Sequence, residues 1–199
     1  KRAKDASRKL ALLGSIKKNE GLKAAAEALL KGEEEILLAN GKDIERAREA
    51  GMNPGMIDRL TLTHERIEAI IEGVNQVISL DDPVGEVLGM KERPNGLLIG
   101  QKRVPMGVIG MIYEARPNVT VDAFALCFKS GNAVILKGGS DALESNKAIV
   151  KWLREGLNGC GLPEDCVQLI TDTDREVTKQ FMRMNGYIDV LIPRGGAGL

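Results

Sequence analysis

The chain has 199 residues, and its 28 Lys and Arg balance 28 Asp and Glu, so the formal net charge is zero. This balance argues against a nucleic-acid-binding protein, which usually carries a basic excess. With 43% apolar and 28% charged residues, the composition is typical of a globular protein and excludes disorder of the whole chain.

Helical periodicity runs through the first eighty residues. Apolar side chains recur at helical spacing from residue 10 to residue 47, and a break rich in Gly and Pro follows at 51–55. Thr63 is expected to cap a further helix that reaches Ile78. Pro83 then ends this helical block.

Extended segments and an alternating pattern follow. Residues 84–91 and 96–104 flank a Pro-Asn-Gly turn, which predicts a hairpin. Strand and helix signals then alternate: the expected strands are 107–113, 133–137, 166–171 and 187–193, and the expected helices are 119–130, 142–157 and 174–184. This alternation predicts an α/β fold with a doubly wound parallel sheet and right-handed crossovers.

Three of the expected strand ends carry candidate ligand-binding residues, because open α/β sheets bind ligands beyond the carboxyl ends of their strands. In Tyr113-Glu114-Ala115-Arg116-Pro117-Asn118, the charged turn forms either a site or only a helix start at Pro117. Lys137-Gly138-Gly139-Ser140 suits a phosphate or ribose, although Ser140 or Asp141 could simply cap the next helix. Arg194-Gly195-Gly196-Ala197-Gly198 is a weaker anion-site pattern, because glycine turns are common.

The remaining reactive side chains have structural interpretations. His64 is the one histidine, which excludes a site that needs two, and we expect it on the surface. Cys127 is expected in the core, and neither Cys160 nor Cys166 has a neighbour in sequence that would lower its thiol pKa. Trp152 belongs to an amphipathic helix, where packing is its expected role.

Cysteine usage and the N-terminus bear on the cellular setting. The three cysteines lack the spacing of a disulfide framework or a metal site. No signal peptide or membrane span is recognisable. We therefore expect a cytoplasmic protein with no metal, no membrane partner and no nucleic-acid partner.

Several stretches resemble one family, the γ-glutamyl phosphate reductases, also called glutamate-5-semialdehyde dehydrogenases. The matching stretches are residues 38–44, 104–110, 112–123, 129–140 and 187–199, and Tyr-Glu-Ala-Arg-Pro-Asn is the most specific run among them. The resemblance covers the whole chain and extends to the aldehyde dehydrogenase superfamily. It implies an NADP-binding domain over residues 1–199, with N-terminal helices and part of an oligomerisation hairpin at about 84–104.

The resemblance also implies an activity, that of a cytoplasmic oxidoreductase of proline biosynthesis. Such an enzyme reduces L-glutamate 5-phosphate to L-glutamate 5-semialdehyde with NADPH and releases phosphate. In the family, a cysteine in a Gly-Asn-Cys-His motif attacks the acyl phosphate to form a thioester that accepts hydride. The 199 residues lack this motif. We therefore expect a catalytic thiol domain downstream of Leu199 and no activity from the segment alone.

Residue roles follow from the same resemblance. The superfamily's oxyanion-binding asparagine aligns with Arg116 without gaps and with Asn118 after a small shift, so both stay candidates. Arg116 could instead bind the substrate's phosphate or carboxylate. The superfamily often has a stretch that ends in a carboxylate where this chain has Lys137, Gly138, Gly139 and Ser140. The serine in place of that carboxylate favours NADP over NAD. Arg194, Gly195 and Gly196 align with the pyrophosphate-binding turn.

Two other functions remain open on the residues. One is another acylating aldehyde dehydrogenase that uses a thioester, although the Tyr-Glu-Ala-Arg-Pro-Asn run argues against it. The other is a catalytically inert nucleotide-binding or dimerisation fragment. The implied partners are a small-molecule substrate, further copies of the chain through the hairpin, and a functionally coupled glutamate kinase.

Overall fold

A four-stranded parallel sheet lies at the centre of the structure, a computed structural model that describes all residues except 115 and 197–199. In spatial order its strands are β5 (Val167–Leu169), β4 (Ala133–Lys137), β3 (Val108–Tyr113) and β6 (Val190–Arg194). All three neighbouring pairs are parallel, so the predicted sheet is confirmed. The two central strands are apolar and almost fully buried, as parallel strands covered on both faces usually are.

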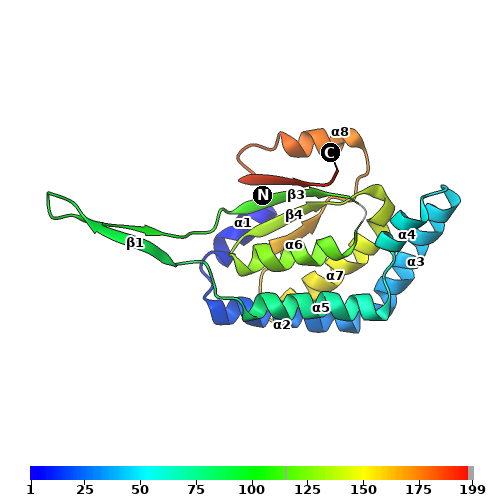
Figure 1. Ribbon diagram of the computed structural model, residues 1–199, viewed down its shortest axis with the longest axis horizontal. Helices are drawn as coiled ribbons and strands as arrows, with labels where there is room; N and C mark the ends of the chain where they lie inside the picture. The colour runs from blue at the N-terminus through cyan, green and yellow to red at the C-terminus, as the bar shows by residue number, and fades with distance from the viewer. Residues whose placement is uncertain (115, 197–199) are drawn as a thin grey trace.

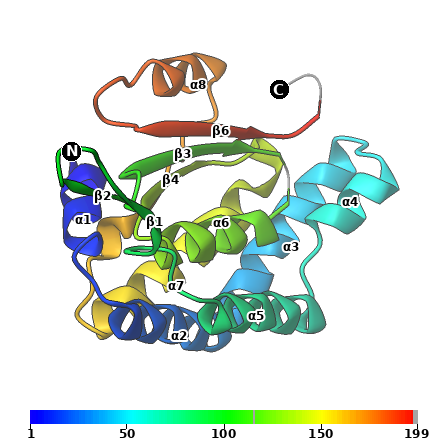
Figure 2. The same cartoon turned by 60° about the vertical axis from the view of Figure 1, so that its left-hand side comes forward.

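Helices cover both faces of this sheet (Figures 1 and 2). On one face lie α6 (Asn118–Lys129) and α7 (Leu143–Gly159), and on the other lie α1 (Arg2–Leu10) and α8 (Arg175–Met182). Phe181 of α8 is 2% exposed and lies over Gly110 of β3. A Cβ at Gly110 would come within 2.9 Å of the Phe181 ring, so the glycine makes room for α8 on the sheet.

The helices of the predicted helical block are α2 (Ser15–Lys31), α3 (Glu33–Glu49), α4 (Pro54–Leu60) and α5 (His64–Ser79). Two of them, α2 and α5, lie beneath α6 and α7, and the other two, α3 and α4, lie at the side (Figure 2). Thr63 caps α5 as predicted, since its hydroxyl accepts the Arg66 backbone N–H at 3.2 Å. His64 is exposed and lies 2.5 Å from Glu33. None of the helices in the described part of the chain is long and apolar enough to cross a membrane.

The predicted hairpin consists of β1 (Val87–Glu92) and β2 (Leu98–Lys102), which pair antiparallel. It projects from the rest of the molecule as a long arm (Figure 1). Every residue of both strands is exposed, including the apolar ones. The apolar side chains of the arm, such as Leu88 at 54% and Leu98 at 62%, therefore stay about half exposed within this chain.

The two outer strands of the parallel sheet, β5 and β6, are shorter than the sequence predicts. The strand expected at 166–171 is only β5, because residues 164–166 turn as the short 3₁₀ helix η2 (Glu164–Cys166) before the pairing begins. The strand expected from residue 187 begins at Val190, since the backbone N–H groups of Tyr187 and Ile188 donate to the Met184 carbonyl. Tyr187 and Ile188 therefore belong to a turn, although they open the apolar run that predicts the strand.

Candidate functional site

The three strand-end motifs lie at one edge of the sheet. Their strands β4, β3 and β6 are adjacent and parallel, so their carboxyl ends, and the loops that follow them, are neighbours. Two cavities open there, and both are lined by Tyr113 and Glu114. Ala115, Ala197 and Gly198 of the motifs lie outside the described residues.

The first cavity, here named the β4 cavity, lies beyond the end of β4. Its wall includes the whole predicted run from Lys137 to Ser140, with Asp141, and α8 contributes Arg175 and Lys179. The Lys137 side chain is buried, and its ammonium lies 3.4 Å from the Gly138 carbonyl oxygen. Three cations therefore face two carboxylates, those of Glu114 and Asp141, and this balance suits an anionic ligand.

A buried polar chain lies directly beneath the Gly138 turn. The Tyr113 and Thr120 hydroxyls are 2.7 Å apart, and Thr120 donates to Asn146 Oδ1 at 2.7 Å. Burial raises the pKa of Tyr113 to about 12, so its phenol stays neutral and donates to Thr120 near neutral pH. A Cβ at Gly138 would come within 2.4 Å of Asn146 Nδ2. The glycine is thus required by the protein's own packing.

The start of α7 differs from the sequence interpretation. Neither Ser140 nor Asp141 caps the helix; residues 140–142 form the short 3₁₀ helix η1 (Ser140–Ala142). The cap comes instead from Asp43 of α3, which is buried. Its carboxylate accepts the backbone N–H of Ser145 at 2.8 Å and the Ser145 hydroxyl at 2.7 Å. Ser140 and Asp141 therefore do not cap α7, and both line the β4 cavity.

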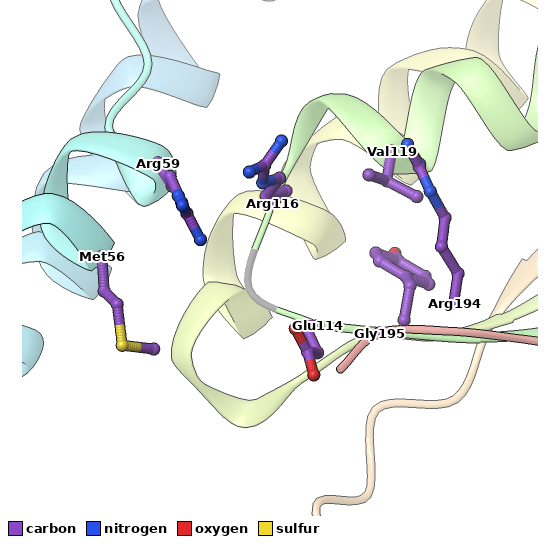
Figure 3. Close-up of a pocket in the computed structure, with 8 residues that line it drawn as sticks. Met56, Arg59, Glu114, Arg116, Val119, Arg194 and Gly195 are labelled. Carbon is purple, nitrogen blue, oxygen red and sulfur yellow. The ribbon is translucent and has the colours of Figure 1, made fainter. Parts of the chain in front are cut away.

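The second cavity, here named the arginine pocket, lies beyond the ends of β3 and β6 and has a volume of about 270 Å³ (Figure 3). Arg59, Arg116 and Arg194 line it, and Glu114 is its one acidic lining residue. Glu114 Oε1 accepts the Gly196 backbone N–H at 2.8 Å, which ties the loop after β6 to the loop after β3. The pocket therefore carries an excess of positive charge.

Arg116 and Asn118 both line a third cavity that adjoins the arginine pocket. Arg116 also lines the arginine pocket, whereas Asn118, the first residue of α6, does not. The Asn118 amide nitrogen lies 3.3 Å from Asp122 Oδ2. Burial raises the pKa of Asp122, and the Arg194 guanidinium and the Asn118 amide act against this rise. Pro117 stands just before the first residue of α6.

Several residues of these cavities carry no signal in the sequence. Met56 and Arg59 come from α4 in the helical block, and Arg175 and Lys179 come from α8. Each is a side chain on a short helix with charged neighbours, a pattern that also describes a solvated surface. Only the folded chain brings them to the strand ends.

The cysteines lie away from these cavities. Cys127 and Cys166 are buried, and burial raises the pKa of each thiol to about 12. Cys160 is exposed at the C-terminal end of α7, which lies at the opposite edge of the sheet because α7 runs back from the end of β4. Within the described residues, no group of three or more His, Cys, Asp or Glu could hold a metal ion.

Known proteins resemble the chain over its whole length. Residues 1–192 match the sequence profile described as "Aldehyde dehydrogenase family". A protein of Geobacillus sp. named gamma-glutamyl phosphate reductase is 57% identical over 194 residues, which are 98% of this chain and 47% of that protein. One of the same name from Heliobacterium modesticaldum is 57% identical over 199 residues, 100% of this chain and 48% of the relative.

Solved structures give the same result. The crystal structure of gamma-glutamyl phosphate reductase from Thermotoga maritima matches with a TM-score of 0.97 and 46% identity, over 100% of this chain and 48% of that one. Propionaldehyde dehydrogenase from Rhodopseudomonas palustris shares the fold alone. Its structure matches with a TM-score of 0.71 and 18% identity, over 99% of this chain and 40% of that one. The chain spans about half the length of the curated relatives it matches.

Proposed function

The chain belongs to the aldehyde dehydrogenase family, and from this premise we propose that it is the cofactor-binding part of an NADPH-dependent γ-glutamyl phosphate reductase. The reaction reduces L-glutamate 5-phosphate to L-glutamate 5-semialdehyde and releases phosphate, a step of proline biosynthesis. The observation that carries the proposal is the 57% identity to proteins of this name across the whole chain. The 18% identity to a propionaldehyde dehydrogenase gives no comparable support for a thioester substrate.

Membership of the family implies a nicotinamide cofactor, which supplies the hydride when it is bound. The donor set at the strand ends fits a dinucleotide. Lys137, Gly138, Gly139 and Ser140 offer a buried ammonium, backbone groups and a hydroxyl on one wall of the β4 cavity. Two strands away, Arg194 ends β6, and Gly195 and Gly196 follow it. Glu114 accepts the backbone N–H of Gly196. We propose that these seven residues bind the cofactor.

NADP is the proposed form of the cofactor. The 2′-phosphate that distinguishes it from NAD needs an excess of cations over carboxylates, and three cations outnumber the two carboxylates of the β4 cavity. Ser140 supplies a hydroxyl in the β4 cavity, and Lys137, Arg175 and Lys179 supply the cations. An arginine can bind a phosphate through two parallel hydrogen bonds, so we assign the main discrimination to Arg175.

The chain's own residues have proposed roles in the reaction itself. Arg116 or Asn118 would donate to the oxyanion or to a substrate anion. The buried Tyr113 phenol stays neutral and fixes the wall between the two cavities. Cys127, Cys160 and Cys166 line neither cavity, and we propose that a cysteine outside these 199 residues supplies the nucleophilic thiol.

The assembly and the setting are also proposed. The exposed apolar residues of the β1–β2 hairpin, among them Leu88, Met90 and Ile99, would become buried between copies of the chain in a homo-oligomer. A glutamate kinase would supply the acyl phosphate, in the cytoplasm, from a fused or separate protein. The three free cysteines agree with a reducing compartment.

The test is phosphate-dependent reduction of NADP⁺ by the intact protein with L-glutamate 5-semialdehyde. Activity that requires phosphate supports the proposal, whereas activity that requires coenzyme A instead would refute it. Arg175→Ala should raise the KM for NADP⁺ by about 10-fold or more, the value of a charged hydrogen bond, and leave the KM for NAD⁺ nearly unchanged. Arg183→Ala is the matched control, because Arg183 is exposed just beyond α8 and lines neither cavity.

A further inference from the structure

Arg59 is an arginine that the described fold leaves without a partner. Its guanidinium makes no ion pair or hydrogen bond with any other described residue, although it lines two cavities. Arg66, close by, is bound by the Asp58 side chain at 2.7 Å and by the Thr61 carbonyl at 2.8 Å. Asp58 is the one acid on α4, so no acid on its own helix remains for Arg59.

The helix that carries Arg59 is fixed in place. Asn40 of α3 is 1% exposed, and its amide donates to the Leu60 carbonyl at 2.9 Å. Asn40 Oδ1 also accepts the backbone N–H of Leu62 at 2.8 Å. Met56 and Arg59 lie three residues apart on α4, and both project toward the loop after β3 (Figure 3). The Arg59 backbone is therefore positioned by buried hydrogen bonds.

Arg59 and Arg116 form the boundary between two cavities of different charge. In the arginine pocket they are joined by Arg194, and Glu114 is the one carboxylate. The adjoining cavity holds two carboxylates beside three arginines: Arg66 is paired with Asp58, and Asp122 remains beside Arg59 and Arg116. An anion is therefore favoured in the arginine pocket, next to the strand ends where the reaction is proposed to occur.

The chemistry of the proposed substrate matches this arrangement. L-glutamate 5-phosphate carries two anionic groups, a phosphoryl group and an α-carboxylate. Guanidinium groups bind both through paired hydrogen bonds. Resting on the proposed function, we infer that Arg59, a residue of the helical block, acts with Arg116 to bind an anionic group of the substrate. Arg59 is thus a specificity-determining residue that the strand-end motifs do not include.

Kinetics of the intact protein test this role. Arg59→Gln should raise the KM for phosphate or for L-glutamate 5-semialdehyde by about 10-fold or more, and it should change the KM for NADP⁺ less than twofold. A rise for phosphate identifies the phosphoryl group, and a rise for the semialdehyde identifies the α-carboxylate. Arg59→Lys should recover part of the loss. Arg48→Gln, an exposed arginine of α3 outside both cavities, is the control. Unchanged KM values for both substrates in Arg59→Gln would overturn the inference.

A binding measurement separates this inference from the proposed function. The melting temperature of the intact protein is followed with inorganic phosphate and, separately, with L-glutamate, so that no turnover is needed. At least one of them should stabilise the wild type and not Arg59→Gln. If this holds while reductase activity is absent, the function falls and the anion site stands. If activity is present without any dependence on Arg59, the site falls and the function stands. Absence of both effects refutes both.

Discussion

The substitution Gly138→Ala adds a single methyl group and should destabilise the folded protein through a clash with buried side chains. The Gly138 backbone does not adopt a positive φ, so alanine is allowed there by conformation. The new Cβ would come within 2.4 Å of Asn146 Nδ2 and 3.1 Å of the Tyr113 hydroxyl. Asn146 is 1% exposed and is held by Thr120, so it cannot move without loss of that hydrogen bond.

The magnitude follows from these two effects. Overpacking costs about 1–3 kcal/mol, and the strained hydrogen bond adds roughly 1 kcal/mol. A loss of at least about 2 kcal/mol should lower the melting temperature by about 4–8 °C in a chain of this size. Thermal unfolding followed by circular dichroism measures this shift.

Gly41→Ala is the matched control. Gly41 lies in α3 with nothing within 4 Å of its Cβ position, so the same methyl group should there stabilise the helix. The expected gain is about 0.5–1 kcal/mol. If Gly138→Ala melted within about 1 °C of the wild type, the close packing of Asn146 beneath the turn would be wrong.

Three further predictions concern single side chains. Asp43→Ala should remove the cap of α7 and cost about 2 kcal/mol or more in urea unfolding, and Asp43→Asn should cost less; equal losses would contradict the acceptor role. In the native protein Cys160 should react with iodoacetamide while Cys127 and Cys166 stay unlabelled, because burial raises the pKa of both thiols to about 12; mass spectrometry of the labelled peptides decides. The hydrogen bond to Glu33 raises the pKa of His64. The stabilisation of the fold by this bond should therefore be complete below a pH of about 6.5, and it should be lost as the pH rises through the raised pKa. An NMR titration that gave an ordinary pKa for His64 would contradict this.

The order of strands and helices could be predicted because each element carries a local signal. The runs that became β3 and β4 are uninterrupted apolar stretches ended by charged or glycine-rich turns. Thr63 has the side chain that a helix N-terminus requires. The cap of α7 could not be predicted, because the acceptor that binds its free N–H groups is Asp43, about a hundred residues earlier in the chain.

The site was predictable only where it follows from topology. Parallel neighbouring strands necessarily bring Arg116, Ser140 and Arg194 to one edge of the sheet. Arg59 and Arg175 reach that edge from helices on opposite sides of it, and their local sequences are those of ordinary surface helices. Charge alone does not distinguish an arginine that faces a cavity from one that faces water.

Asn40 and Asp43 also give the two cavities a shared support. They stand three residues apart on α3; Asn40 holds the end of α4, and Asp43 holds the start of α7. α4 carries Arg59, and the turn that leads into α7 carries Ser140. Because one turn of α3 holds both segments, a substitution that displaces this turn should disturb the two cavities together.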